Sequence, residues 1–349
     1  MESTISNLRL PLLITGVAGV AGYNAFHYFR KRFPGQVIGL RPHQTFRLNG
    51  DGIVAMDADD ADGMRDLFRE VRFRSVLNCV GNCALKSCEL DKEMARRLNV
   101  VTAEVLVENV RELGARLVHL SSDLVFSGRP RRLEDSSAGL LGNYVETDGT
   151  DPVTIYGKTM VLAEQIISDS VRDAAILRIS LPMGPSFNEH AGAIDWINSR
   201  FRHGRPATLY FDEVRSAAYC DDLNHVFERM LHNDAAGLYH CGGPRPITLY
   251  QIGQIVNRVG GYAPHLLHGC PRIESGPIPP RAGNVSMNST KLAELLGFQP
   301  FQPWPAEPDW VPTDRHWHRE RAPSEIGSHQ LIRELLYANH QSRARSPAQ

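Results

Sequence analysis

The residues with the clearest chemical meaning lie in one short stretch, Ile155-Tyr156-Gly157-Lys158-Thr159-Met160. A tyrosine followed four residues later by a lysine would form a proton-donating pair, because four residues return to nearly the same helix face. The fourth position after Tyr156 is Met160 here. Lys158 would point about 200° away from Tyr156, so it cannot simply take the place of the lysine.

A glycine-rich turn near the N-terminus is the candidate cofactor site. The apolar run at residues 8–15 suits a strand buried on both faces, and glycines follow it at Gly16, Gly19 and Gly22. A helix to about residue 32 and a second strand at 36–40 complete a β-α-β unit. Glycines at such a turn let backbone amides at a helix N-terminus reach a pyrophosphate, because no Cβ intervenes.

The spacing of this turn, G-x-x-G-x-x-G, also occurs in tight strand–helix turns that bind nothing. Its position at the first β-α junction favours dinucleotide binding. The residues of the turn expected to contact the cofactor are Gly16, Val17, Ala18, Gly19, Val20 and Gly22.

The end of the second strand bears on the choice between NADP and NAD. An acidic residue there would hold a ribose 2′-hydroxyl, whereas an arginine better accommodates a 2′-phosphate. The strand ends in Gly39-Leu40-Arg41-Pro42-His43, so Arg41 favours NADP, with NAD as the other cofactor considered. The competing interpretation is a solvated surface arginine.

The alternation of strands and helices predicts an α/β fold, a Rossmann-like doubly wound parallel sheet of five or six strands. Further strands are expected at residues 52–56, 75–80, 116–120 and 174–181, with helices at 61–71, 90–113 and 156–168. Right-handed crossovers then bring the carboxyl ends of the strands, and the ligand, to one edge.

Three parts of the chain are expected. Residues 1–183 form the dinucleotide-binding domain, and a segment at about 207–245 returns to it. Residues 184–302 form a smaller, discontinuous substrate lobe, where the pattern after Pro182 becomes irregular. Residues 303–349 form an extension rich in proline and tryptophan, with a helix at 324–340 and a disordered end at 341–349.

Composition and charge exclude several partners. The 349 residues carry a formal net charge of −1, which gives no electrostatic basis for binding nucleic acid or an anionic membrane. No signal-peptide pattern is present, and the apolar stretch at 10–21 is too short to span a bilayer. A cytoplasmic location is therefore expected.

Six cysteines give no metal-binding pattern. Cys79, Cys83 and Cys88 lie close together, but their spacing is neither C-x-x-C nor that of a zinc finger. Buried small side chains and a loop thiol are favoured over a metal role, and no metal is predicted. The isolated Cys220, Cys241 and Cys270 receive no function.

Several segments together resemble the extended short-chain dehydrogenase/reductase family, and within it the dTDP-4-dehydrorhamnose reductase branch. Beyond the glycine turn, the resemblance rests on Asn78 to Gly81 (family N-x-A-G), Asn99, Ser121 to Gly128 (S-T-D-Y-V-F-x-G) and Tyr156 to Thr159 (Y-G-K-T-K). Later matches lie at 219–222, 237–240 and 289–292. The resemblance runs from about residue 10 to about residue 298.

The resemblance implies hydride transfer to the C4 carbonyl of a nucleotide-linked sugar. Tyr156 would donate the proton and Ser122 would hydrogen-bond the carbonyl oxygen, as a developing alkoxide requires. A strand-end cap at Ser122 and a buried aromatic at Tyr156 are the competing interpretations. The resemblance also places Asp57, Cys79, Val80 and Gly81 against the cofactor and Ser121, Asp123 and Leu124 against the substrate. Relatives often form dimers, so a homodimer is an open alternative.

Two departures from the family pattern bear on activity. Leu124 replaces a tyrosine that would meet the sugar, and Met160 replaces the lysine that lowers the tyrosine pKa and holds the nicotinamide ribose. A tyrosine without a cationic neighbour should titrate near 10, and losing such a partner commonly costs roughly 10²–10³ in rate.

The predicted function is therefore an NAD(P)H-dependent reductase of a nucleotide-linked 4-keto-sugar with impaired or altered catalysis. The main alternative is a regulatory protein that binds the cofactor or nucleotide sugar without turnover, as the β subunit of methionine adenosyltransferase illustrates for this family. A scaffold with an empty cleft is a third possibility, against which the intact glycine turn argues.

Overall fold

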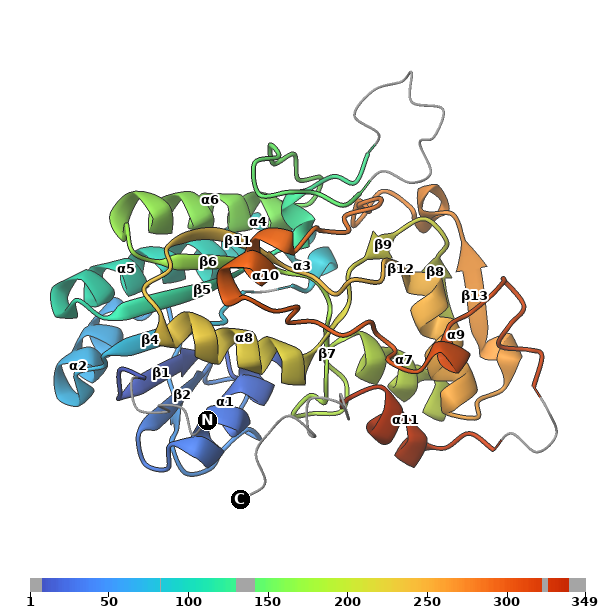
Figure 1. Ribbon diagram of the computed structural model, residues 1–349, viewed down its shortest axis with the longest axis horizontal. Coiled ribbons are helices and arrows are strands. Elements are labelled where there is room, and N and C mark those ends of the chain that lie inside the picture. The colour runs from blue at the N-terminus through green and yellow to red at the C-terminus, as the bar shows by residue number, and fades with distance from the viewer. Residues whose placement is uncertain (1–7, 82, 130–141, 322–325, 339–349) are drawn as a thin grey trace.

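Seven parallel strands organise the larger of two lobes (Figure 1). The computed structural model describes residues 8–81, 83–129, 142–321 and 326–338. In spatial order the strands are β11 (Gly237–Cys241), β6 (Ala175–Ile179), β5 (Arg116–Ser122), β4 (Ser75–Asn78), β1 (Leu12–Thr15), β2 (Val37–Arg41) and β3 (Ile53–Ala55). The Rossmann-like doubly wound fold is thus confirmed, and it has more strands than the five or six predicted.

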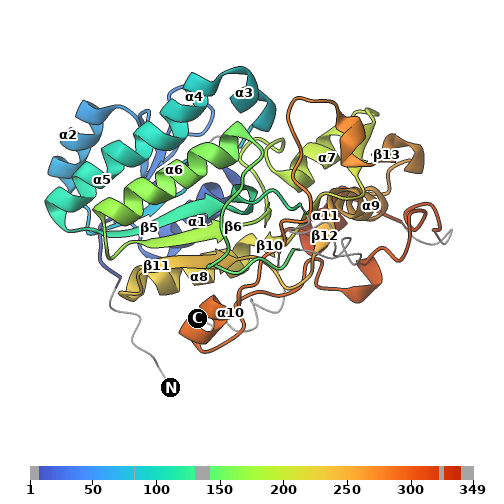
Figure 2. The ribbon, with the colours of Figure 1, turned by 90° about the horizontal axis from the view of Figure 1, so that it is seen from above.

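Helices cover both faces of this sheet (Figure 2). One face carries α2 (Ala61–Val71), α5 (Thr102–Leu113) and α6 (Ile155–Ser170). The other carries α1 (Val20–Arg32) and α8 (Cys220–His232), and α10 (Thr290–Leu296) packs against β11. Central strands such as β1 and β4 are buried at every residue, as expected for a sheet covered on both sides.

The single helix predicted at 90–113 is instead a chain of short helices. These are α3 (Leu85–Leu90), α4 (Lys92–Arg96), a π-helical segment (Arg97–Val101) and α5. The helix is interrupted at Asp91, between α3 and α4. The periodicity of apolar residues hides the π segment, because such a segment adds less than one residue to a turn. The π segment contains the buried Asn99, whose side chain contacts α6.

The smaller lobe contains three two-stranded sheets and two main helices. Its strand pairs are β7 (Pro182–Met183) with β10 (Ala218–Tyr219), β8 (Ala207–Tyr210) with β13 (Leu267–Cys270), and β9 (Val214–Arg215) with β12 (Ile247–Thr248). The helices are α7 (Ala193–Arg202) and α9 (Leu249–Val259). Of the segment predicted to return to the large lobe at about 207–245, α8 and β11 lie there, whereas β8 pairs with β13 in the small lobe.

The C-terminal extension is part of the core of the small lobe. Trp304 is fully buried and donates from its indole Nε1 to the carbonyl oxygen of Leu336, 3.0 Å away. Helix α11 (His329–Leu335) is shorter than the predicted 324–340, and its Ile332 packs into the same cluster. The predicted disorder at 341–349 lies outside the described residues.

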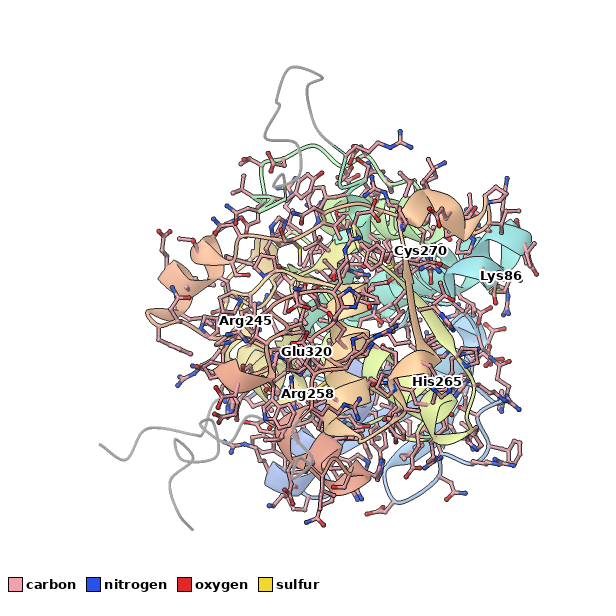
Figure 3. All side chains as sticks on the ribbon, turned by 90° about the vertical axis from the view of Figure 1, so that its right-hand side faces the viewer. Lys86, Arg245, Arg258, His265, Cys270 and Glu320 are labelled. Carbon is pink, nitrogen blue, oxygen red and sulfur yellow. The ribbon has the colours of Figure 1, made fainter. Side chains whose placement is uncertain are left out.

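The part of the extension around Trp317 lies over α9. Trp317 packs under the guanidinium of Arg258, which lies 4.2 Å from the indole ring centre. In Figure 3, which faces the small lobe, Arg258 and Glu320 mark this region. Within the described parts of the chain, no helix is both long and apolar enough to cross a membrane.

Candidate active site

The glycine turn joins β1 to α1, and two of its three glycines are required by the protein itself. Gly16 has φ +67°, and a Cβ there would lie 2.4 Å from the carbonyl oxygen of Cys79. A Cβ on Gly22 would lie 2.4 Å from the carbonyl oxygen of Gly16. These contacts hold the first turn of α1 close to the end of β4.

Gly19 differs from its two neighbours. It is the N-cap of α1, and a Cβ there would meet only the carbonyl oxygen of Gly16 at 3.4 Å, an ordinary contact. Packing inside the protein therefore does not require glycine at this position. An open backbone at a helix N-terminus fits a pyrophosphate, whose oxygens accept hydrogen bonds from amides that no Cβ shields. The turn thus has the form needed for a dinucleotide.

A polar network lies directly beneath the turn. The Thr15 hydroxyl donates to Asn78 Oδ1 at 2.6 Å, and Asn78 Nδ2 lies 2.8 Å from His119 Nδ1. The Nε2 atom of His119 is buried, with no partner among the described residues, and burial lowers the pKa of His119 to about 4. The imidazole is therefore neutral at pH 7, and the network joins β1, β4 and β5 without adding charge.

Tyr156 is held in the first turn of α6 by several contacts. Thr154 caps the helix by accepting a hydrogen bond from the Gly157 amide at 2.9 Å. Asn99 Nδ2 donates to the hydroxyl of Thr159 at 2.8 Å. A Cβ on Gly157 would lie 2.1 Å from the carbonyl oxygen of Leu124, so glycine lets α6 approach the end of β5. The helix face that carries Tyr156 is thus fixed by backbone packing.

Tyr156 and Met160 face the end of β4. A Cβ placed on Gly81 would lie 3.7 Å from Met160 Sδ and 3.9 Å from Tyr156 Oη. Both side chains are buried, whereas Lys158 is exposed. The structure therefore places Lys158 on the outer face of α6, as the helical geometry predicts, and Met160 beside the phenol.

The electrostatics around Tyr156 keep its hydroxyl protonated. Burial raises the pKa of Tyr156, and the neighbouring Cys83 and Asp123 raise it further, while a hydrogen-bonding contact with Ser122 and the charge of Arg215 lower it. Ser122 lies at the end of β5, where its hydroxyl accepts from the Leu124 amide at 3.2 Å. Ser122 therefore both caps the end of the strand and lies next to Tyr156.

Arg215 corrects the expectation that Tyr156 has no cationic neighbour. It lies on β9, far from Tyr156 in sequence, and forms two hydrogen bonds to Asp123, at 2.7 and 2.5 Å. Burial opposes its charge, but the Asp123 carboxylate raises the pKa of Arg215 overall. Because Asp123 pairs with it so closely, Arg215 only partly offsets the other influences on Tyr156.

The residues predicted to contact substrate do not share one surface. Asp123 is fully buried between Arg215 and the hydroxyl of Ser180, 2.6 Å away. Ser121 donates to Glu164 at 2.5 Å, and Glu164 is paired with Arg178. The Ser121 hydroxyl therefore belongs to a structural network under α6 and is not brought to Tyr156, because adjacent strand residues point to opposite faces.

Leu124 packs into the cluster of apolar side chains around Tyr156. This cluster also contains Phe126, Val285 and Met287. The family tyrosine at position 124 would place a hydroxyl here, whereas leucine leaves this wall of the site apolar.

Arg41 and Asp57 meet in the turn after β2. The Arg41 guanidinium donates to the carbonyl oxygens of Pro42 at 3.1 Å and His43 at 3.2 Å. The Asp57 carboxylate accepts from the His43 amide at 3.2 Å. Both side chains therefore lie beyond the second strand, where an adenosine ribose would bind, and Arg41 would have to leave the backbone carbonyls to hold a 2′-phosphate.

Sequence reasoning missed Cys83 and Arg215 as neighbours of Tyr156. Cys83 is solvent-exposed as a residue, yet the protein atoms around its thiol raise the pKa of that group. Cys83 lies in the loop between the N-x-A-G-like segment and α3. That position was the only feature of the sequence that could have placed Cys83 near Tyr156. Arg215 has no local signal, since β9 brings it to the site from the other lobe.

Comparison with known proteins identifies the same family over most of the chain. The family described as RmlD substrate binding domain matches residues 10–307. The spore coat polysaccharide biosynthesis protein SpsK of Bacillus subtilis is 24% identical over 76% of this chain and 90% of its own length. The dTDP-4-dehydrorhamnose reductase of Salmonella typhimurium is 30% identical over 57% of this chain and 64% of its own. Methionine adenosyltransferase 2 subunit beta of Xenopus tropicalis is 26% identical over 69% of each chain.

Solved structures share the fold at lower identity. UDP-glucose 4-epimerase of Thermotoga maritima, solved with UDP-glucose, superposes with a TM-score of 0.70 at 20% identity, covering 84% of this chain and 94% of its own. The dTDP-4-dehydrorhamnose reductase of Bacillus anthracis, solved with NADP, has a TM-score of 0.66 at 19% identity, with 84% and 95% covered.

Proposed function

The chain belongs to the RmlD substrate binding domain family, and we propose that it is an NAD(P)-dependent oxidoreductase acting on a nucleotide-linked 4-keto-sugar. The observation that carries the proposal is the position of Tyr156, which contacts Ser122 and lies beside Gly81 in the segment after β4. The same segment contacts the glycine turn through Cys79. A proton donor and a cofactor turn thus share one edge of the sheet. The sugar, the nucleotide and the preference for NADP or NAD are part of the proposal.

Tyr156 is the proton donor in this proposal. When bound, the nicotinamide supplies a hydride to the carbonyl carbon of the sugar, and the carbonyl oxygen then needs a proton. Burial raises the pKa of Tyr156, so the phenol stays protonated over the working pH range and can donate. Ser122 orients the carbonyl oxygen through its hydroxyl, and the Arg215–Asp123 pair fixes the strand end that carries it.

Met160 sets the expected limit on the rate. Proton donation leaves Tyr156 as a phenolate, and a cation on α6 would stabilise that phenolate while it exists. The thioether of Met160 supplies none, and Arg215 is shared with Asp123. We therefore expect slow turnover with binding largely preserved.

The test is NADPH oxidation with a panel of dTDP- and UDP-linked 4-keto-sugars, run for the wild type and for Met160→Lys. Slow wild-type turnover that rises in Met160→Lys supports the proposal. Turnover by neither protein, together with unchanged NADP binding, would replace it with the second candidate below.

The second candidate is a protein that binds cofactor or nucleotide sugar without turnover and regulates a partner. Methionine at position 160 favours this candidate, because the loss of the family lysine removes a charge from the proposed catalytic site and leaves the glycine turn intact. One relative is named as the beta subunit of a methionine adenosyltransferase. A thermal shift with NADP or NAD, combined with no oxidation of NADPH by any sugar in the panel, would support this candidate.

A further inference from the structure

Glu213 is a buried carboxylate that the proposed chemistry does not use. It precedes β9 and is only 2% exposed. Its backbone carbonyl accepts a hydrogen bond from the Leu249 amide at 3.0 Å, so its position is fixed at the junction with α9. Its Oε2 atom is buried and has no hydrogen-bond partner within the described parts of the chain. Such an atom is costly to bury unless another group satisfies it.

Two arginines lie near Glu213 without forming hydrogen bonds to it. Arg281 Nη1 is 3.6 Å from Glu213 Oε2, and Arg215 Nη1 is 3.9 Å from Oε1. The Nε atom of Arg281 is likewise buried and lacks a partner among the residues described. By contrast, Arg215 makes two short hydrogen bonds to Asp123. Arg281 therefore has a buried Nε donor to spare, and Glu213 is its loosely held counter-ion.

The charges in this cluster cancel. Arg215 and Arg281 face Asp123 and Glu213, while Arg272 is paired with Asp212 at 3.5 Å. An anionic ligand that approached Arg281 would meet the ionised Glu213 and be repelled by it. Protonating Glu213 would remove this repulsion, release Arg281 and create an O–H donor for the ligand.

We infer that Glu213 takes up one proton from solvent when the pyrophosphate of a nucleotide sugar binds beside Arg281. The inference rests on the proposed function for the identity of the ligand. The bound carboxylic acid can donate to a phosphate oxygen while Arg281 neutralises the phosphate charge. Glu213 thus makes nucleotide-sugar binding weaken as the pH rises.

The surroundings of Glu213 raise its pKa on balance. Burial raises the pKa of Glu213. Arg215 on the following strand β9 lowers it, as do Arg281 and Arg272 from the segment after β13, and Asp123 from the end of β5 raises it. Cys270, labelled in Figure 3, marks where that segment begins. A bound dianion would add a further upward shift.

The test measures proton uptake directly. Binding of UDP-glucose and dTDP-glucose is followed by calorimetry between pH 5.5 and 8.5 in two buffers with different ionisation enthalpies. Both phosphates of these probes are diesters and do not titrate in this range, so an uptake belongs to the protein. For the better-binding probe we expect an uptake approaching one proton and a Kd that rises up to about tenfold per pH unit.

Variants locate the proton. Glu213→Gln should bind without proton uptake, with a flat pH profile and a lower Kd than the wild type at pH 8. The matched control is Glu274→Gln, an exposed residue of the same lobe, which should keep the wild-type profile. Circular dichroism checks that both variants are folded.

The outcomes separate the inference from the proposed function. Binding by the wild type without proton uptake, or an equal uptake in Glu213→Gln, would overturn the role of Glu213 and leave the proposed function standing. The wild-type measurement alone decides this if Glu213→Gln fails to fold. No binding of either probe would overturn both.

Discussion

The glycine turn and the first turn of α6 meet at one edge of the sheet, but only the glycine turn has all the residues of the family pattern. At the turn, a Cβ on Gly16 or Gly22 would lie less than 2.5 Å from a backbone oxygen, so both positions require glycine. Gly19 is also a glycine, although packing does not require one there. At α6, the anchors of the helix remain, while the side chain that should carry charge is Met160. The position of the helix that carries Tyr156 is therefore separable from the charge on its inner face.

The largest effect is expected at Tyr156. Replacing it with phenylalanine removes the only proton donor assigned to the carbonyl oxygen and should lower kcat by roughly 10²–10⁴ while leaving NADP binding unchanged. Steady-state NADPH oxidation and a fluorescence titration of NADPH measure the two quantities. Tyr239→Phe, on the distant edge strand β11, should behave as wild type. Equal activity in Tyr156→Phe would assign the proton to another group.

Met160→Lys should act in the opposite direction. A cation next to the phenol lowers the pKa of Tyr156 and stabilises its phenolate, so kcat should rise by roughly 10²–10³. The alkaline limb of the kcat–pH profile should also move to lower pH. Met160→Leu, which adds no charge, and Lys158→Met, on the exposed face, should show neither change. A gain in Met160→Leu would point to packing and not to charge.

The network beneath the glycine turn should make the stability of the large lobe decrease at acid pH. The pKa of His119 is lowered to about 4 in the folded protein, from 6.5 when unfolded. Its contribution to stability is therefore complete above pH 6.5 and is lost as the pH falls towards 4. The loss amounts to about 3 kcal/mol, by about 1.4 kcal/mol per pKa unit.

Urea unfolding between pH 4 and 7 measures this contribution. His119→Gln should flatten the decline in the free energy of unfolding over that range, whereas His265→Gln, at an exposed position, should not. An identical decline in both variants would show that groups other than His119 cause the loss of stability at acid pH.

The smallest effect is expected at Gly19. A methyl group fits within the protein there, so Gly19→Ala should unfold at the wild-type urea concentration. It should weaken NADP binding about tenfold to a hundredfold, the loss of roughly one charged hydrogen bond. Gly22→Ala is the contrast, because its Cβ would collide with Gly16 and lower stability itself. Unchanged NADP affinity in Gly19→Ala would remove the turn from the cofactor site.

Local patterns in the sequence sufficed for the parts whose geometry depends on neighbours in the chain. The β-α-β unit around Gly16, the helix that begins near Tyr156 and the outward direction of Lys158 all follow from short-range periodicity and backbone sterics. The π segment near Asn99 was hidden, because it changes the helical phase without interrupting the apolar pattern. The predicted helix merged α4, the π segment and α5 for that reason.

Contacts between distant segments could not be read from the sequence. Arg215 reaches Asp123 from 92 residues away through the pairing of β9 with β12, and no motif marks either strand. Glu213 lies beside it for the same reason. Ser121 and Ser122 are adjacent in the chain, yet the strand alternation sends one hydroxyl to Glu164 and the other towards Tyr156.

The burial of Trp304 against Leu336 also has a consequence for the order in which the molecule is made. All seven strands of the large sheet have been synthesised once Cys241 has emerged from the ribosome. The core of the small lobe still lacks Trp304, Ile332 and Leu336 at that stage. The growing chain should therefore contain every strand of the large sheet while the small lobe still exposes apolar surface, which is the kind of surface that chaperones and proteases recognise.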